Sequence, residues 1–165
     1  MSPKVVLVGP PGSGKSTVAT LLAKRLGLPY EDADTLVETR VGKAISDIFI
    51  DSGEAEFRRL ERAAVIEVLG HDGIVSLGGG AVLDPDSRAD LAGHTVVFLD
   101  VSLSEAATRV GLGTSRPLLL GNVRGRLKQL MDARRPLYAE VATFTVDTNG
   151  RKPEEIADEI AGKVS

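Results

Sequence analysis

The stretch Gly9-Pro10-Pro11-Gly12-Ser13-Gly14-Lys15-Ser16-Thr17 has a glycine, four further residues and then Gly-Lys-Ser, the pattern of a phosphate-binding loop. An apolar run over residues 4–8 precedes it and predicts a buried parallel strand, and residues 18–26 predict an amphipathic helix ended by Gly27. In this context the glycines turn successive N–H groups inward and the helix N-terminus adds to their charge, so the loop can bind a polyanion. A glycine-rich turn without a ligand is the alternative.

The composition is that of an ordinary soluble chain of 165 residues, long enough for one compact domain with a hydrophobic core. Its formal net charge is −3, which does not favour nucleic-acid binding. It has no cysteine, which excludes disulfides and thiolate chemistry. We find no N-terminal signal pattern and no apolar run long enough to cross a bilayer. We therefore expect a cytoplasmic enzyme that binds neither nucleic acid nor membrane.

Short apolar segments alternate with amphipathic ones along the rest of the chain, which predicts an α/β domain with a parallel five-stranded sheet. The further strands are expected at residues 28–30, 74–77, 95–99 and 144–147. The further helices are expected at about residues 35–40, 45–49, 54–69, 85–93, 105–110 (capped by Ser104), 126–140 and from Pro153 onward. Ligands bind at the carboxyl ends of the strands in such sheets. The loop at Gly9, the acidic residues after the second strand and the glycines after the third should therefore face one cleft.

Asp32 and Asp34 are those acidic residues, two apart at the end of the predicted second strand. Alternate residues of an extended chain point the same way, so both carboxylates can face the cleft. One can hold a magnesium-bound water while the other accepts a proton from a substrate hydroxyl. The alternative is a solvated acidic turn that caps the next helix. Position alone leaves both interpretations open.

Gly78-Gly79-Gly80 follows the third strand, where three glycines cost conformational entropy. They are favoured where a ligand approaches the backbone closely, and a plain flexible loop is the alternative. Arg58 begins a helix in which Glu54 lies four residues earlier, so an ordinary surface ion pair is the alternative to a binding role.

Arg116 lies in the glycine-flanked segment 111–124, which we expect to be a loop. Such a segment can close over a site as a lid and bring a guanidinium to the migrating phosphoryl group. A mobile surface loop with an incidental arginine is the alternative. The run Arg134-Arg135-Pro136-Leu137-Tyr138 offers one arginine that can grip a substrate carboxylate, unless it is only a basic helix face.

Taken together, these stretches resemble the shikimate kinase family over nearly the whole chain. The loop alone is shared by many nucleotide-binding enzymes, but the other motifs in this order are much more specific. The motifs are residues 9–17, Asp32-Ala33-Asp34, Gly53-Glu54-Ala55-Glu56-Phe57-Arg58, Leu77-Gly78-Gly79-Gly80-Ala81, Arg116-Pro117-Leu118 and the run 134–138. The family often has threonine or serine where this chain has Ala33.

The resemblance implies a single kinase domain over residues 1–165, built like a nucleoside monophosphate kinase with sheet order 2-3-1-4-5. It implies transfer of the ATP γ-phosphate to the 3-hydroxyl of shikimate, in the chorismate branch of aromatic amino acid synthesis. ATP and Mg²⁺ are the implied cofactors, shikimate the partner, and a monomer the expected state. The shikimate-binding region spans about residues 32–62 and the lid about residues 111–124.

The resemblance also implies a role for each matching residue. Asp34 is the proton acceptor, Lys15 bridges the β- and γ-phosphates, and Arg116 is the lid arginine. Shikimate is held by Asp34, Arg58, Gly78, Gly79, Gly80 and Arg134. The nucleotide is held by Pro11, Gly12, Ser13, Gly14, Lys15, Ser16, Thr17, Arg109, Arg116, Arg151 and Pro153. Ser16 binds magnesium directly and Asp32 binds it through water.

Two other functions stay open from the residues alone. A kinase for another small metabolite, such as gluconate, shares the loop but does not need the acidic pair together with the Arg-x-Pro-Leu-Tyr run. A nucleotide-binding switch predicts slow hydrolysis that does not depend on an acceptor.

Overall fold

The computed structural model describes residues 3–109 and 117–164, and of residues 117–124 it describes the backbone alone. The strands are β1 (Pro3–Val8), β2 (Tyr30–Asp32), β3 (Gly73–Ser76), β4 (Val96–Asp100) and β5 (Phe144–Asp147). The helices are α1 (Lys15–Leu26), α2 (Ala33–Val41), α3 (Ile45–Val68), the short 3₁₀ helix η1 (Ala81–Leu83), α4 (Pro85–Asp90), α5 (Leu103–Arg109), α6 (Pro117–Val141) and α7 (Pro153–Val164).

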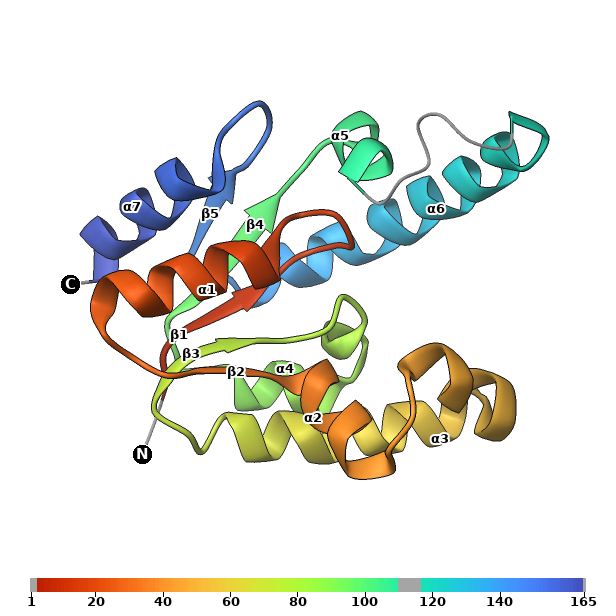
Figure 1. Cartoon of the computed structure of the whole chain (residues 1–165), viewed down its shortest axis with the longest axis horizontal. Coiled ribbons are helices and arrows are strands. Elements are labelled where there is room, and N and C mark those ends of the chain that lie inside the picture. Colours follow the sequence, from red (N-terminus) through yellow and green to blue (C-terminus); the bar gives the residue numbers. More distant parts are fainter. Residues whose placement is uncertain (1–2, 110–116, 165) are drawn as a thin grey trace.

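The five strands form one sheet in the order β2-β3-β1-β4-β5, and every pairing is parallel, which confirms the predicted class and order. Strand β1 is central because its residues Val5 to Val8 are apolar on both faces and almost fully buried. Helices cover both faces of this sheet (Figure 1). The phosphate-binding loop therefore leaves the sheet at its middle, between the ends of β3 and β4.

Two hydrophobic cores hold the helices on the sheet. Helices α1 and α7 pack on the face that presents Val5 and Leu7, and they contact each other. Helices α2, α3 and α6 pack on the opposite face, against Val6 and Val8 of the same strand. A third cluster joins α5 to α6 through Ala106, Ala107, Leu127 and Met131. Across residues 3–109 and 117–164, no helix is long and apolar enough to span a membrane.

Several predicted boundaries were wrong. Helix α2 begins directly after Asp32, and α6 begins at Pro117, so residues 117–124, which we expected to be a loop, are helical. Proline suits the first position of a helix because it has no N–H to leave unpaired. The Oγ atom that accepts the Glu105 N–H at the start of α5 belongs to Ser102, not to Ser104. The two helical pieces expected around Gly53 are present, because Gly53 has φ 84° and ψ 168° and kinks α3.

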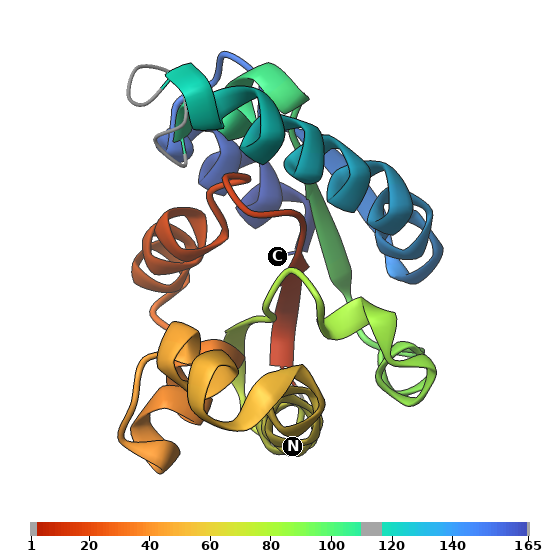
Figure 2. The same ribbon diagram turned by 90° about the vertical axis from the view of Figure 1, so that its right-hand side faces the viewer.

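The carboxyl edge of the sheet lies between α6 and the α2–α3 region. Figure 2 looks onto this edge, with α6 on one side of the loops and α2 and α3 on the other. Both chain termini lie at the opposite end of the sheet in Figure 1. The loops after β1, β2 and β3 thus meet where the sequence places its polar motifs.

Candidate active site

A cavity of about 650 Å³ opens at the carboxyl edge of the sheet. The phosphate-binding loop forms its floor, Asp32, Asp34, Gly78 and Gly79 line one end, and the other end is lined by Arg109, Arg151, Pro153 and Ile156. The structure thus brings together the nucleotide set predicted from the sequence, apart from Arg116, with one part of the substrate set. The remaining predicted substrate residues, Arg58, Gly80 and Arg134, are not part of this lining.

The glycines of the loop are required by packing as well as by conformation. Gly12 has φ 80°, and a β-carbon there would lie 2.8 Å from the carbonyl oxygen of Ala106. At Gly9, a β-carbon would lie 2.7 Å from the carbonyl oxygen of Leu99. Contacts under 3 Å are repulsive, so a side chain at either position would displace the loop from β4 or α5.

Lys15 is folded onto the loop that carries it. Its Nζ donates to the carbonyl oxygens of Gly9 at 2.7 Å and Pro10 at 3.2 Å. Burial lowers the pKa of Lys15 to about 8, while the charges of Asp34 and Asp32 oppose this shift. Lys15 is therefore largely protonated at neutral pH and is held above the loop, where a phosphate chain would lie.

Asp32 combines the two roles that the sequence left as alternatives. Its Oδ1 accepts the Thr35 N–H at 2.9 Å and so caps α2. Its Oδ2 accepts the Ser76 hydroxyl at 2.6 Å, because register pairs Asp32 with Ser76 across β2 and β3. The residue still lines the cavity, so capping and exposure to the cleft are compatible.

Asp34 reaches the cleft by a route that the strand argument did not foresee. It lies in the first turn of α2, not in an extended chain, so alternation along a strand is the wrong reason for its direction. Its Oδ1 is buried and has no hydrogen-bond partner among the described residues. Burial, reinforced by the charges of Asp32 and Glu61, raises the pKa of Asp34 to about 6. This is a carboxylate poised to take a proton near neutral pH.

Arg58 makes the expected contact to Glu54 at 3.4 Å, but its shorter contact is to Glu61 at 2.9 Å. Glu61 is only 4 % exposed, and burial raises its pKa while Arg58 and Arg134 oppose that rise. A buried carboxylate on one side of the guanidinium fixes its orientation, which an exposed pair does not do. Sequence reasoning missed Glu61, although it lies three residues after Arg58 on the same helical face.

The two adjacent arginines of α6 have different surroundings. The Arg135 Nη1 donates to both carboxylate oxygens of Asp100, at 2.6 and 2.7 Å, and so ties α6 to the end of β4. Arg134 instead faces the substrate end of the cleft, where its charge lowers the pKa of Lys15 and of Tyr138. The arginine available to a ligand is therefore Arg134.

The three glycines after β3 are divided among three charged side chains. A β-carbon at Gly78 would lie 2.5 Å from Asp34 Oδ1, and one at Gly79 would lie 3.6 Å from Arg134 Nη1. At Gly80 it would overlap the guanidinium of Arg58. The loop is therefore packed directly against all three predicted substrate residues, which the flexible-loop alternative does not explain.

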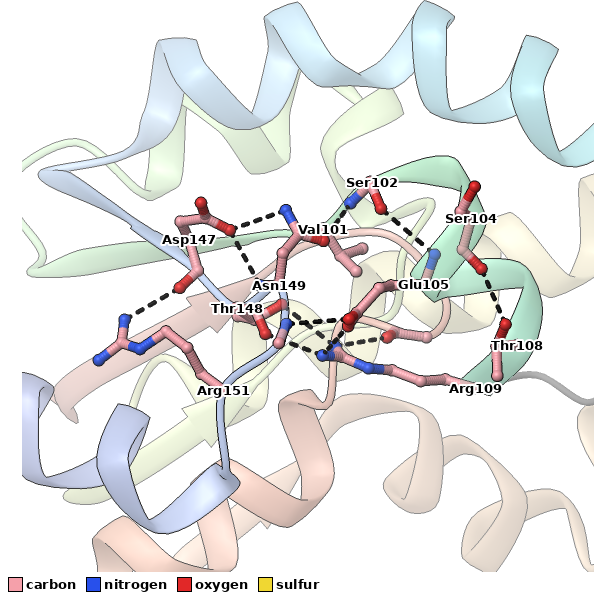
Figure 3. A network of polar contacts seen from close by, with 12 residues as sticks. Val101, Ser102, Ser104, Glu105, Thr108, Arg109, Asp147, Thr148, Asn149 and Arg151 are labelled. Atoms are coloured by element: carbon pink, nitrogen blue, oxygen red, sulfur yellow. Dashed lines mark hydrogen bonds and ion pairs between the residues drawn. The ribbon is translucent and has the colours of Figure 1, made fainter.

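A polar network connects the predicted base-binding residues at the other end of the cavity (Figure 3). Arg109 donates to the Gly12 carbonyl at 3.1 Å, to the Thr148 carbonyl at 2.9 Å and to Glu105 at 2.7 Å. Glu105 also accepts the Gly150 N–H at 2.9 Å. Arg151 donates to the Asp147 carbonyl at 2.9 Å. The network joins α5, the phosphate-binding loop and the turn before α7, and Glu105 is a member that the sequence did not reveal.

Arg116, the predicted lid arginine, lies outside the described residues. Helices α5 and α6, which flank the segment containing it, are packed together by the third hydrophobic cluster.

A parallel α/β sheet with a phosphate-binding loop at its centre, and a buried carboxylate beside the loop's lysine, defines a phosphotransferase of the nucleoside monophosphate kinase type. The family model for shikimate kinase matches residues 11–165. The chain therefore belongs to the shikimate kinase family, ATP-dependent enzymes of the aromatic amino acid pathway.

Similar proteins agree with this assignment over almost the full length. Shikimate kinase from Salinispora arenicola is 58% identical over 162 residues, covering 98% of this chain and 97% of that protein. The relative from Thermobifida fusca is 55% identical, covering 96% and 93%. Among solved structures, shikimate kinase from Acinetobacter baumannii in complex with shikimate has a TM-score of 0.90 at 33% identity, covering 99% and 93%. A gluconokinase from Sinorhizobium meliloti has a TM-score of 0.61 at 24% identity, which shows a shared fold alone.

Proposed function

We propose that this chain transfers the γ-phosphate of ATP to the 3-hydroxyl of shikimate, giving shikimate 3-phosphate and ADP. The observation that carries the proposal is the buried Oδ1 of Asp34, which has no partner among the described residues and lies against Gly78, in the cavity that Lys15 also lines. A buried polar atom without a partner is costly unless a ligand satisfies it. A substrate hydroxyl at this position would supply the missing hydrogen bond.

The acceptor end of the cleft suits a small hydroxylated acid. Arg58, held by Glu61, and Arg134 supply two guanidinium groups for one carboxylate, and Asp34 takes the hydroxyl. The Gly79 backbone is the surface on which the substrate ring lies. The structure of the relative from Acinetobacter baumannii, which holds shikimate, supports this choice of acceptor.

The nucleotide end suits ATP. The loop N–H groups and the start of α1 bind the phosphate chain, and Arg109, Arg151 and Pro153 flank the base. Lys15 leaves the Gly9 and Pro10 carbonyls to bridge the β- and γ-phosphates. In the transfer, the shikimate oxygen forms a bond to the γ-phosphorus, the bond to the ADP oxygen breaks, and Asp34 accepts the hydroxyl proton.

The residues beside the loop fit a magnesium ion. Mg²⁺ prefers oxygen ligands and keeps several waters and phosphate oxygens, so it needs one or two protein groups and not a cage of its own. Ser16 and Asp32 offer a hydroxyl and a carboxylate on the same wall of the cavity. We propose that Ser16 binds the ion directly and Asp32 through water. When bound, the ion neutralises charge on the β- and γ-phosphates.

The test is an ADP-release assay with shikimate, gluconate and a nucleoside monophosphate as separate acceptors. Release that requires shikimate supports the proposal. Activity on gluconate or the nucleotide with none on shikimate rejects it, and slow release without any acceptor indicates a nucleotide switch. Light scattering on the purified chain tests the further proposal that the enzyme acts as a monomer, as expected for a cleft lined by one chain.

A further inference from the structure

A tyrosine hydroxyl lies beside the predicted magnesium site, although no sequence motif includes it. Tyr30 is in the edge strand β2, two residues before Asp32, so both side chains extend from the same face of the sheet. Its hydroxyl lies 3.1 Å from Asp32 Oδ2 and 2.8 Å from the Ser76 hydroxyl. Ser76 itself is fully buried and donates to the same Asp32 oxygen at 2.6 Å.

The hydrogen bonds leave Asp32 with little freedom. A carboxylate offers about four lone-pair positions. The Thr35 N–H takes one of them, and Ser76 takes a second. The Tyr30 proton is shared between Asp32 and the Ser76 oxygen. The carboxylate is thus held ionised and in one rotamer, with capacity left for a water in the cavity.

The same tyrosine reaches the second predicted magnesium ligand. Burial raises the pKa of Tyr30, and hydrogen bonds with Ser76 and Ser16 oppose that rise. A serine hydroxyl that gives a lone pair to a metal ion must direct its single proton elsewhere. The Tyr30 oxygen is an acceptor for that proton, because the tyrosine's own proton is directed to Asp32 and Ser76.

We propose that Tyr30 is a positioning residue for the magnesium site, orienting the Ser16 hydroxyl and the Asp32 carboxylate at once through its own hydroxyl. The inference rests on the proposed function, since it assumes that these two residues serve the ion. Groups that hold metal ligands in place commonly change metal affinity by 10- to 100-fold when they are removed.

The test measures metal binding directly. Mn²⁺ is titrated into the complex of the enzyme with ADP, and free Mn²⁺ is followed by electron paramagnetic resonance. Tyr30→Phe keeps the ring and removes the hydroxyl, and we expect it to weaken Mn²⁺ binding about 10-fold. ADP affinity without metal and the KM for shikimate should stay unchanged. Thr20→Val is the matched control, because it removes an exposed hydroxyl of α1 that donates only to the Ser16 carbonyl.

A second variant keeps the test decisive if Tyr30→Phe is unstable. Ser76→Ala removes the other hydroxyl donor to Asp32 and leaves the Tyr30 ring in place, so it should also weaken Mn²⁺ binding. A lower melting temperature with unchanged Mn²⁺ affinity would mean that Tyr30 only supports β2, and it would overturn the inference. Unchanged affinity in an enzyme that phosphorylates shikimate contradicts the inference alone, whereas a wild type inactive on shikimate contradicts the proposed function.

Discussion

The Tyr138 hydroxyl donates a 2.5 Å hydrogen bond to the carbonyl oxygen of Gly79. Tyr138 is 1% exposed, its ring packs on Phe98, and burial raises its pKa to about 12, so it keeps its proton at every working pH. The bond fixes the middle residue of the triple glycine from behind, while the front of the loop faces the cavity. Helix α6 therefore positions the substrate floor as well as supplying Arg134.

Tyr138→Phe tests this support. The variant leaves the buried Gly79 carbonyl without its partner, which we expect to lower the free energy of unfolding by about 1 kcal/mol. Because the loop is less well fixed, the KM for shikimate should rise about 5-fold, a change of similar free energy. Chemical denaturation and steady-state kinetics measure the two effects. An unchanged KM for shikimate would mean that the bond stabilises the fold without shaping the site.

Alanine at the glycines should separate their three neighbours. Gly78→Ala pushes the Asp34 carboxylate and should lower kcat about 100-fold, the usual cost of a 1 Å misplacement. Gly80→Ala pushes the Arg58 guanidinium and should mainly raise the KM for shikimate. Gly162→Ala in α7 is the control, because a β-carbon there meets nothing within 4 Å and favours the helix. Equal kinetics for Gly78→Ala and Gly162→Ala would contradict the assigned packing.

Some of this site could be predicted from the sequence and some could not. The loop and strand β1 were predictable because their signals are local: glycine spacing and a continuous apolar run. Arg134 could not be told from Arg135 by any local property, since the distinction depends on Asp100, which lies more than thirty residues away at the end of β4. The early start of α6 was missed because glycines at 121 and 125 lower helix propensity, whereas its packing on α5 involves residues far along the chain.

The pH dependence of kcat/KM should be bell-shaped. The pKa of Asp34 is raised to about 6, so below that pH the carboxylate is protonated and cannot accept the hydroxyl proton. The pKa of Lys15 is lowered to about 8, so above that pH the lysine loses its charge on the phosphates. Rates should thus fall on both sides of this window. Asp34→Asn should lower kcat by roughly 10²- to 10⁴-fold while nearly preserving ATP binding.

Stability gives an independent check on Asp34. Its folded pKa is higher than the unfolded value of 3.8, so the folded chain binds the proton more tightly and loses stability as pH rises through this range. Asp34→Asn should therefore be more stable than the wild type at pH 8, with a difference that shrinks toward pH 4. Melting temperatures across that range measure it. A variant less stable at pH 8 would show that the Asp34 charge is compensated in the fold.

Replacing each of the two α6 arginines by alanine should give different results. Arg134→Ala removes a guanidinium aimed at the substrate, and we expect the KM for shikimate to rise roughly 10- to 100-fold. Arg135→Ala breaks the pair with Asp100, which is partly exposed and contributes no more than about 1 kcal/mol. Its KM for shikimate should change only a few-fold. Each variant is the control for the other, and a reversed order would assign the carboxylate to Arg135.

Glu105 should affect the nucleotide and not the acceptor. Its two carboxylate oxygens hold the Arg109 guanidinium and the Gly150 N–H, so it joins the two walls of the predicted base site. Glu105→Gln keeps the shape but weakens these charge-assisted bonds, and we expect ADP affinity to fall about 5-fold by calorimetry. The KM for shikimate should stay the same, because Asp34, Arg58 and Arg134 are untouched. Glu155→Gln, on the exposed first turn of α7, serves as the control. If shikimate affinity fell as much as ADP affinity, the network would support the whole cleft and not its nucleotide end.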